Sequence, residues 1–471
     1  MRMPRIVLPV EVCAEAFPAD PDFPQLRIAS DSGRMLEVFR RHLKPLSGRV
    51  YELQECIPYR FRCRQSTARC VLQYTLRVVE PGAGRQWSQW VTGVLYGKPG
   101  EARRLCAELQ AAIPRRGIPE AWLAFEPVDF IPDLQMLVQV FPFDRKLPNL
   151  CPVLDGAALR GLDSRLLESL GPGQWQIERR HIEPARYRTE LGAALKYTVQ
   201  AREPLTTRSL TQSCYLKVYR NERGQETFDL MRALAESAAA DRGLFAVVRP
   251  LAYLSELRTL VLEEAVGATL QQLLLGGGDL ATPMRAAARA VAAFNQADLR
   301  IGRHHSLAEQ LDDLRRASSL VQWACPRSRV EVQAITAAVV AGLEEVPPAP
   351  IHRDFKIDHL FLSGDRVTFI DLDSVALGDP VRDPAHLWAH LSGGAGLAVL
   401  SAEGARLAAE VFVEEYFAQV PKAWRQRFPL HCAGALIEVA GGIFKRQEPF
   451  WPLTLPILVE RAGLALTGRL W

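Results

Sequence analysis

The spacing of hydrophobic and polar residues predicts a group of strands in the middle of the chain. Residues 195–201, 213–219 and 259–263 are rich in apolar and β-branched side chains over lengths that suit strands. Residues 225–239, which lie between the second and third of these segments, have the apolar spacing of a helix. The pattern therefore predicts a domain in which strands are followed by a helix and then by further strands.

The same order of elements is predicted a second time, nearer the N-terminus. The string PVDFIPDLQMLVQV aligns without a gap on PLAYLSELRTLVLE, 123 positions further along the chain. The same offset joins Tyr74 to Tyr197, Tyr96 to Tyr219 and Leu134 to Leu257. The triplet Arg60-Phe61-Arg62 matches Arg186-Tyr187-Arg188 once an insertion of three residues is allowed. The chain therefore contains an internal repeat.

The length of the repeat predicts an internal duplication of a whole domain. Solenoid repeats are shorter and need at least about three copies to bury their faces. We therefore expect one copy in residues 1–150 and another in residues 164–268. The boundary between the copies is expected within residues 144–163.

The last part of the chain, residues 269–471, has the pattern of a helical domain. Residues 284–299, 307–321 and 330–343 carry apolar residues at helical spacing with charged residues on the other face. Residues 430–466 also predict helices, with breaks expected at the glycine pair 441–442 and at the prolines between 449 and 456.

Composition and charge narrow the range of partners and locations. The chain has 471 residues, of which 48% are hydrophobic, enough for two or three cores. Its net charge is only +4 and its arginines are dispersed, so we expect neither a nucleic-acid partner nor a membrane partner. The nine cysteines are scattered and odd in number, which favours reduced cysteines in a soluble cytoplasmic protein.

Two segments carry the candidate chemistry, IHRDFKIDHLFL at 351–362 and FIDLDSVALGDPVRDPAHL at 369–387. Asp354 lies in the first, and Asp371 follows a β-type run in the second. A hairpin of strands 360–362 and 366–370 would bring these two carboxylates to one end of a common scaffold. Phosphoryl transfer needs one carboxylate as base and another to hold a magnesium ion, and these two residues fit those roles.

Over residues 215–391 the chain resembles the aminoglycoside phosphotransferase family, the small-molecule branch of the protein-kinase-like fold. The matching motifs are His352-Arg353-Asp354, then Asp371, then Gly378-Asp379-Pro380 followed by Asp383. The resemblance implies an α+β, bilobal fold with an antiparallel N-lobe and a mainly helical C-lobe. It also implies ATP and Mg²⁺ as cofactors, a small-molecule hydroxyl as acceptor, Asp354 as the catalytic base and Asp371 as a metal ligand.

A kinase N-lobe also needs a lysine on an inner strand and a helix glutamate to hold that lysine. Lys217 alternates with apolar residues on a predicted strand and is the candidate lysine. Its expected partner is Glu226, at the start of the following helix, with Glu236 as the reserve. The resemblance places the adenine-binding hinge in residues 262–267, where the backbone of Glu263, Glu264 and Ala265 would contact the base.

Three departures from the family pattern bear on activity. His359 stands where the family has a metal-binding Asn, so a second metal is held by His359 or Asp358, is held through water, or is absent. The loop expected over the phosphates, residues 184–195, contains a single glycine. The first copy has Val94 and Arg103 where the second has Lys217 and Glu226.

These departures leave more than one function open. The first copy is interpreted as a degenerate N-lobe used for packing, for shaping the acceptor site or for binding a protein partner. The leading hypothesis is a kinase acting on a small-molecule hydroxyl. The alternative is a weak or inactive pseudokinase-like scaffold that binds nucleotide, and a third hypothesis is an enzyme that modifies another protein.

Overall fold

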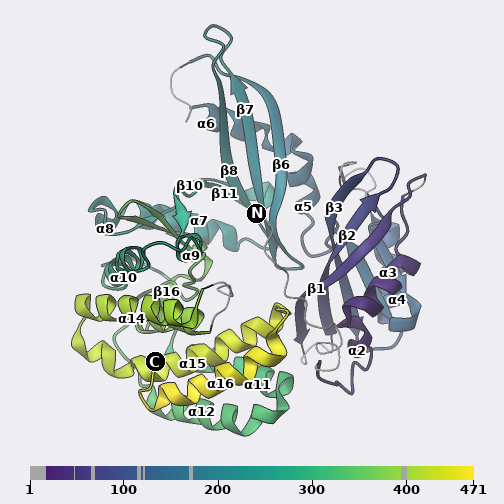
Figure 1. Cartoon of the computed structure of the whole chain (residues 1–471). Coiled ribbons are helices and arrows are strands. Elements are labelled where there is room, and N and C mark those ends of the chain that lie inside the picture. Colours follow the sequence, from purple (N-terminus) through teal and green to yellow (C-terminus); the bar gives the residue numbers. More distant parts are fainter. Residues whose placement is uncertain are drawn as a thin grey trace. The chain divides into compact units, whose positions relative to one another are not determined.

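The computed structural model describes residues 17–46, 48–64, 69–113, 118–119, 122, 124–168, 173–393 and 400–470 (Figure 1). The chain divides into two compact units. Unit 1 comprises Met1–Gln225, Leu251–Leu262 and Lys445–Pro449, and unit 2 comprises Glu226–Pro250, Glu263–Phe444 and Phe450–Trp471. Among the described residues, no helix combines the length and the apolar character needed to cross a membrane.

Unit 1 contains two five-stranded sheets. The first has the order β1-β2-β3-β5-β4, and its neighbouring strands are antiparallel. Its elements are α2 (Leu26–Ala29), α3 (Ser32–His42), β1 (Glu52–Arg64), β2 (Arg69–Glu80), β3 (Arg85–Tyr96), α4 (Glu101–Ala112), β4 (Val128–Ile131), η3 (Pro132–Leu134) and β5 (Met136–Val140).

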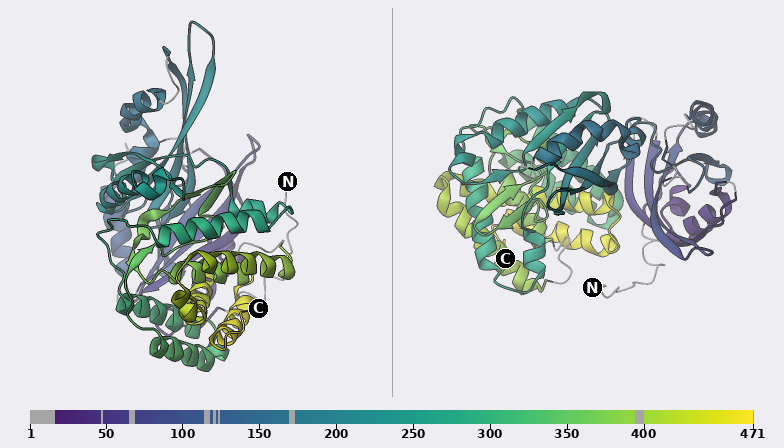
Figure 2. Two further views of the ribbon diagram at one scale, coloured as in Figure 1. Left: turned by 90° about the vertical axis from the view of Figure 1, so that its left-hand side faces the viewer. Right: turned by 90° about the horizontal axis from the view of Figure 1, so that it is seen from above.

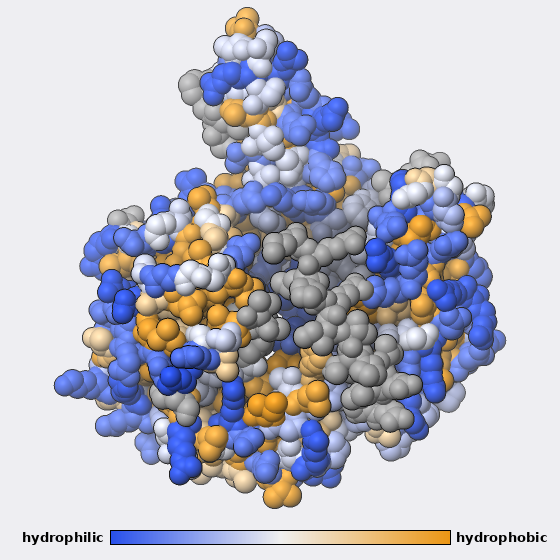
Figure 3. Space-filling model, in the orientation of Figure 1, coloured by the Kyte–Doolittle hydropathy of each residue, from blue (hydrophilic) through white to orange (hydrophobic). Residues whose placement is uncertain are grey.

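The second sheet has the order β10-β11-β8-β7-β6, so β8 is its central strand. Its strands are β6 (Gln176–Arg188), β7 (Gly192–Arg202), β8 (Ser209–Tyr219), β10 (Pro250–Leu254) and β11 (Thr259–Glu263), with η5 (Ser255–Leu257) between the last two. The strands expected at 195–201, 213–219 and 259–263 are confirmed. On the face seen in Figure 3, the end of unit 1 that holds the β7–β8 hairpin mixes hydrophilic and hydrophobic residues.

The two sheets have equivalent strand orders, with β1, β2, β3, β5 and β4 of the first corresponding to β6, β7, β8, β11 and β10 of the second. The first strand of each has two register irregularities, the second of which lies at Pro58/Arg60 in β1 and at Pro184/Arg186 in β6. A left-handed residue follows each 3-10 turn, Gln135 with φ 47° and Arg258 with φ 44°. The folding pattern therefore repeats along with the sequence, while its origin in a duplication stays a prediction.

The turn between β6 and β7 is buried against the first sheet. Thr189 and Glu190 are each 2% exposed. The carboxylate of Glu190 accepts a hydrogen bond from Arg62 at 2.9 Å and pairs with Arg69, while the hydroxyls of Thr189 and Thr92 are 2.9 Å apart. Because this turn lies in the loop expected over the phosphates, the first sheet fixes the conformation of that loop.

A short helical connector joins the two sheets. It consists of α5 (Leu150–Asp155), η4 (Ala157–Leu159) and α6 (Arg160–Glu168), and it falls largely within the boundary expected at 144–163. Asp163 of α6 accepts hydrogen bonds from the hydroxyl of Tyr197 at 2.7 Å and from Arg180 at 2.7 Å. Leu159, Leu162 and Leu166 of the connector belong to the same apolar core as β7 and β8.

Unit 2 is mainly helical. Its helices are α7 (Arg223–Ala235, whose first residues fall in unit 1), α8 (Ala238–Asp241), α9 (Leu270–Leu275), α10 (Ala281–Asn295), α11 (Leu307–Ala324), α12 (Arg329–Gly342), α13 (Arg382–Ser392), α14 (Ala402–Gln419), α15 (Lys422–Lys445) and α16 (Trp451–Leu466). Helices α10 and α14 lie side by side (Figure 2). The helices expected in 284–299, 307–321 and 330–343 are confirmed, and α11 begins at a capping box formed by Ser306 and Glu309.

Two small sheets lie among the helices of unit 2. One has the order β12-β14-β15-β9 and the other pairs β13 with β16. Their strands are β9 (Ala246–Val247), β12 (Ala268–Thr269), β13 (Ala349–Ile351), β14 (Leu360–Ser363), β15 (Arg366–Phe369) and β16 (Ala376–Gly378). The predicted hairpin is therefore confirmed, as β14 and β15.

The expected breaks in the last helices are wrong at two points. Helix α15 runs through Gly441 and Gly442, and a Cβ added at Gly441 would lie 3.6 Å from the Cβ of Ala317. The glycine thus lets α15 pack closely on α11. Helix α16 runs through Pro456, which leaves the carbonyl of Pro452 without its usual helical donor. Arg327 donates to that carbonyl at 3.4 Å, which compensates for the lost bond.

Candidate active site

The loop that carries Asp354 follows β13 and is fixed by a buried carboxylate. Asp383, in the first turn of α13, is fully buried. It accepts hydrogen bonds from the backbone N–H of His352 at 2.8 Å, the backbone N–H of Arg353 at 2.9 Å and Nδ2 of Asn295 at 3.0 Å. Burial raises the pKa of Asp383, although these hydrogen bonds and nearby His352 oppose the rise. Asp383 therefore holds the backbone of the Asp354 loop in place.

His352 joins the Asp354 loop to the segment that carries Asp371. Its Nε2 lies 2.9 Å from the carbonyl oxygen of Ile370, so Nε2 must carry the proton. Its Nδ1 then accepts from the backbone N–H of Asp354 at 3.4 Å. The ring is buried and stacks on Phe355, and burial lowers its pKa. A neutral imidazole therefore links the two carboxylate-bearing segments.

A cluster of aromatic side chains packs against Phe355, the residue after Asp354. Phe355 packs against Phe294 and Phe369, with ring centroids 6.2 Å and 5.0 Å away, and Phe369 stacks on Phe245 at 5.6 Å. All four rings are fully buried. Phe369 is the last residue of β15, so the same core fixes the end of the strand that leads to Asp371.

The carboxylate of Asp354 is paired with Lys356, a residue that the sequence reasoning missed. The Nζ atom of Lys356 lies 2.8 Å from the carboxylate of Asp354. Burial alone would raise the pKa of Asp354, but the charge of Lys356 and the nearby His359 and His386 outweigh burial and lower it. Asp354 is therefore ionised at neutral pH. The signal in the sequence was a cation two residues after the candidate base.

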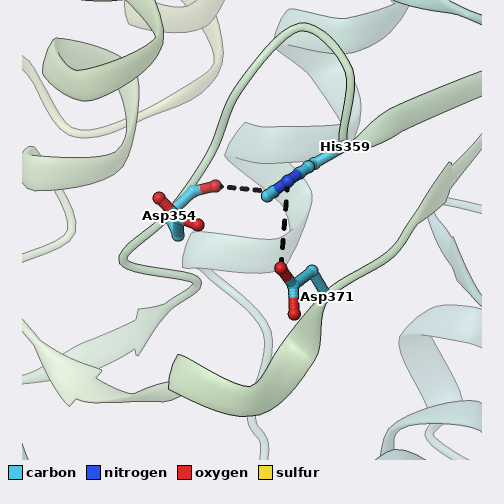
Figure 4. A group of neighbouring side chains, drawn as sticks. All are labelled: Asp354, His359 and Asp371. Carbon is cyan, nitrogen blue, oxygen red and sulfur yellow. Dashed lines mark hydrogen bonds and ion pairs between the residues drawn. The ribbon is translucent and has the colours of Figure 1, made fainter. Parts of the chain in front are cut away.

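Asp354, His359 and Asp371 form a group that can hold a metal ion (Figure 4). One donor atom from each lies within 4.8 Å of the other two, and they form the one such group found among the described residues. The carboxylate oxygens suit Mg²⁺, and ligands on opposite sides of this ion are about 4 Å apart. Both metal candidates from the sequence, Asp371 and His359, are thus brought to Asp354. The imidazole of His359 suits Mg²⁺ less well than the amide oxygen that the family pattern has there.

Two residues of the site have left-handed backbones. Arg353 has φ 70° and Asp371 has φ 61°. Such a conformation costs about 1 kcal/mol or more in a non-glycine residue and persists where the surroundings enforce it. Asp383 and His352 supply that enforcement through the hydrogen bonds described above. The strain therefore falls on the Asp354 loop, at Arg353, and on Asp371 itself.

Lys217 lies on β8, the central strand of the second sheet in unit 1. Its neighbours Leu216 and Val218 are buried and Lys217 is half-buried, as the sequence predicts. Its Nζ lies 5.9 Å from the centroid of the Tyr219 ring. In the first sheet, the aligned Val94 is fully buried and Arg103 lies over the ring of Phe130. The first sheet thus has no lysine at this position.

Glu226 lies in the first turn of α7 and is linked to the loop after Asp371. Its carboxylate accepts from Nη2 of Arg303 at 2.8 Å, and Nη1 of Arg303 donates to the carbonyl of Asp373 at 2.6 Å. This bridge connects the start of α7 to the segment that follows Asp371. The pairing of Glu226, or of Glu236, with Lys217 stays a prediction.

The expected hinge residues follow the last strand of the second sheet. Glu263 ends β11 and accepts from the backbone N–H of Arg249 at 2.9 Å, so its side chain is engaged within unit 2. Glu264 and Ala265 have no regular secondary structure. Gly267 has φ 104°, and a Cβ there would lie 2.1 Å from the carbonyl oxygen of Leu362. The segment after the hinge therefore needs glycine to pass β14.

This geometry suits a phosphotransferase: an ionised carboxylate lies close to a second carboxylate that could hold a cation, on a helical unit that follows a five-stranded sheet in the sequence. A family model described as the phosphotransferase enzyme family matches residues 157–419, more than half of the chain. The chain belongs to this family. It is therefore a phosphotransferase with an alcohol group as acceptor. Among curated proteins, none matches the sequence significantly.

Several solved structures are similar to the chain at low identity. A candidate aminoglycoside phosphotransferase from Ralstonia eutropha is 15% identical, with a TM-score of 0.43, over 66% of this chain and 96% of that one. A choline/ethanolamine kinase family protein from Mesorhizobium loti is 14% identical, with a TM-score of 0.39, over 66% and 98%. An ethanolamine kinase from Plasmodium vivax is 8% identical, with a TM-score of 0.41, over 68% and 91%. The family assignment rests on the family model and not on these scores.

Proposed function

We propose that the protein transfers the γ-phosphoryl group of ATP to a hydroxyl group of a small molecule, with Mg²⁺ as the expected cation. The observation that carries the proposal is the convergence of Asp354 and Asp371, which lie on different segments, with donor atoms within 4.8 Å. The low pKa of Asp354 supports it, because a base must be ionised to accept a proton.

The chemical step assigns one role to each side chain. The acceptor oxygen forms a bond to the γ-phosphorus, the bond between this phosphorus and the ADP oxygen breaks, and the hydroxyl proton passes to the carboxylate of Asp354. Lys356 keeps that carboxylate ionised beforehand. The divalent cation, when bound, would neutralise charge on the phosphates, and Asp371 would hold it with Asp354 and His359 adjoining.

The nucleotide contacts belong to the same proposal. Lys217 would meet the α- and β-phosphates, because it is half-buried on the central strand of the second sheet, and an inner strand is where a kinase-like N-lobe needs a fixed positive charge. Glu226 would orient Lys217. The backbone of Glu263, Glu264 and Ala265 would contact the adenine edge.

The test is phosphoryl transfer from ATP to a panel of alcohols, sugars and amino alcohols, with product detected by mass spectrometry. Asp354→Asn should lower turnover by about 10²-fold or more, on the scale of a positioned base. Lys217→Ala should do the same. Asp365→Asn, in the exposed turn of the β14–β15 hairpin, is the matched control and should keep full turnover. Unchanged turnover in Asp354→Asn would refute the proposal.

The second candidate function is that of a nucleotide-binding scaffold without turnover. The observation that favours it is His359, an imidazole where the family pattern has an amide oxygen. Calorimetry separates the two. Binding of ATP with Mg²⁺, together with no transfer to any acceptor and no hydrolysis, would favour the scaffold.

A further inference from the structure

A contact within its own loop sets the tautomer of the His359 ring. Its Nδ1 lies 2.9 Å from the carbonyl oxygen of Asp354. A carbonyl can only accept, so Nδ1 carries the proton, and in the neutral ring the lone pair lies on Nε2. Metal-binding histidines are usually oriented in this way, by an N–H donated from the other ring nitrogen to a carbonyl or carboxylate.

The Nε2 atom faces carboxylates without forming a hydrogen bond to them. It lies 3.9 Å from Oδ2 of Asp371 and 4.0 Å from Oδ1 of Asp358, and both distances are too long for a hydrogen bond. The side chain is 2% exposed, so its packing fixes the direction of the ring. In Figure 4 the ring lies between Asp354 and Asp371, with one edge toward the carboxylate of Asp371.

This donor set differs from the oxygen-only set that Mg²⁺ prefers. Mg²⁺ is a hard cation that binds oxygen and gives up its waters reluctantly. Imidazole suits the transition metals, and affinity for nitrogen-containing sites rises along the series that begins with Mn²⁺. Mn²⁺ also accepts carboxylate and phosphate oxygens, so it satisfies both kinds of donor.

We propose that Asp354, His359 and Asp371 form a mixed oxygen and nitrogen site that selects Mn²⁺ over Mg²⁺, with Nε2 of His359 as a direct ligand. The inference deepens the proposed function, because it assigns the cation of the same phosphoryl-transfer site. His359 is then a metal ligand in its own right and not a defective replacement for an amide.

The decisive measurement is pulsed electron paramagnetic resonance of MnCl₂ bound to the full chain with a non-hydrolysable ATP analogue. We expect hyperfine coupling from a directly bound nitrogen, which shifts to the ¹⁵N frequency when the protein is labelled with ¹⁵N-histidine. Absence of nitrogen coupling from bound Mn²⁺, or absence of Mn²⁺ binding, would overturn the inference. This readout uses the unaltered chain and needs no turnover.

Affinities of a variant supply the second arm. His359→Asn restores an amide oxygen, and we expect the ratio of the Mg²⁺ to the Mn²⁺ dissociation constant to fall by about tenfold or more, since changes to groups that merely support a ligand already cost 10–100-fold. His181→Asn, on an exposed histidine of β6, is the control and should keep the wild-type ratio. Equal ratios in wild type and His359→Asn would count against selectivity. If His359→Asn does not fold, the wild-type spectrum decides.

The outcomes separate this inference from the proposed function. Nitrogen coupling without transfer to any acceptor would support the metal site and refute the enzymatic role. Transfer at equal rates with Mg²⁺ and Mn²⁺, without nitrogen coupling, would support the enzyme and refute the selective site.

Discussion

Replacement of Asp383 tests whether a buried carboxylate fixes the catalytic loop. In Asp383→Ala, the backbone N–H groups of His352 and Arg353 and the amide of Asn295 lose their common acceptor. These two backbone N–H groups lie at and next to the strained Arg353. They cannot reach new acceptors unless the loop changes its conformation. The change should therefore lower both the stability of unit 2 and the turnover of the enzyme.

The magnitude follows from the three hydrogen bonds. A hydrogen bond to a charged group contributes about 1.5–3 kcal/mol, so three together would exceed 4 kcal/mol. The variant also removes a carboxylate whose burial raises its pKa and opposes its ionisation, which offsets part of the loss. We therefore expect a decrease in the free energy of unfolding of about 3–5 kcal/mol, the range for breaking a buried charged network.

The assay is urea unfolding followed by circular dichroism, with turnover measured well below the midpoint of unfolding. Asp383→Asn keeps the shape of the side chain, but its NH₂ group would face a backbone N–H that now donates to Asp383. The Asp354 loop should shift as a result, and a shift near 1 Å should lower turnover by about 10²-fold. Asp365→Asn is exposed and should change stability by less than about 0.5 kcal/mol. A loss below about 1 kcal/mol in Asp383→Ala, with normal turnover, would refute the reasoning.

Three further predictions concern charged groups. Lys356→Ala removes the cation beside Asp354, so the pKa of Asp354 should rise and the acidic limb of the rate profile should move to higher pH. Glu190→Gln leaves the arginines at the β6–β7 turn unneutralised and should cost about 3 kcal/mol in unfolding. His386→Asn should reduce the loss of stability in acid, because burial lowers the pKa of His386 in the folded chain.

Each of these has its own control and contrary outcome. Lys356→Arg keeps the charge and should keep the profile, and a profile unchanged in Lys356→Ala would contradict the assignment. Glu183→Gln changes an exposed residue of β6 and should leave the free energy of unfolding unchanged. Equal losses of stability in Glu183→Gln and Glu190→Gln would contradict a stabilising role for the contacts of Glu190 with Arg62 and Arg69. The neutral, buried His386 contributes its full stability to the folded chain above the pKa of about 6.5 that it has in the unfolded chain. This contribution is lost as the pH falls from there through the lower pKa of the folded chain. An identical slope between pH 5 and 7 in wild type and His386→Asn would contradict its burial as the neutral form.

Much of the fold could be predicted because local pattern and tertiary structure agree. Residue 307 was expected to begin a helix, and α11 begins there, because the capping box of Ser306 and Glu309 acts within one turn. The β14–β15 hairpin was predictable for the same reason, since its turn residues adjoin both strands. The breaks in α15 and α16 were not, because contacts from Ala317 and Arg327, more than 100 residues away, allow a glycine and a proline inside a helix.

The candidate site shows the same division between local and distant causes. Asp354 and Asp371 were predictable from motif order, and their approach was predictable from the hairpin between them. The hydrogen bond from His352 to the carbonyl of Ile370, which joins the two segments, follows from no spacing rule. The proton position on His359 was equally hidden, because it depends on the direction in which one carbonyl points. The sequence alone indicated that His359 weakens the metal site. The direction of its ring instead favours the proposed preference for Mn²⁺ over Mg²⁺.

The β6–β7 turn gives the first sheet a physical role. A glycine-rich loop is free to close over phosphates because glycine adopts many conformations, and this turn instead contains Glu190 in a left-handed conformation with φ 60°. The arginines of the first sheet neutralise its buried carboxylate, and Asp144 accepts its backbone N–H at 2.7 Å. Contacts with the first sheet therefore hold the β6–β7 turn in its conformation. Removal of the first sheet should make this turn more flexible. Among the roles left open for residues 1–150, packing that shapes this loop is the one these contacts favour.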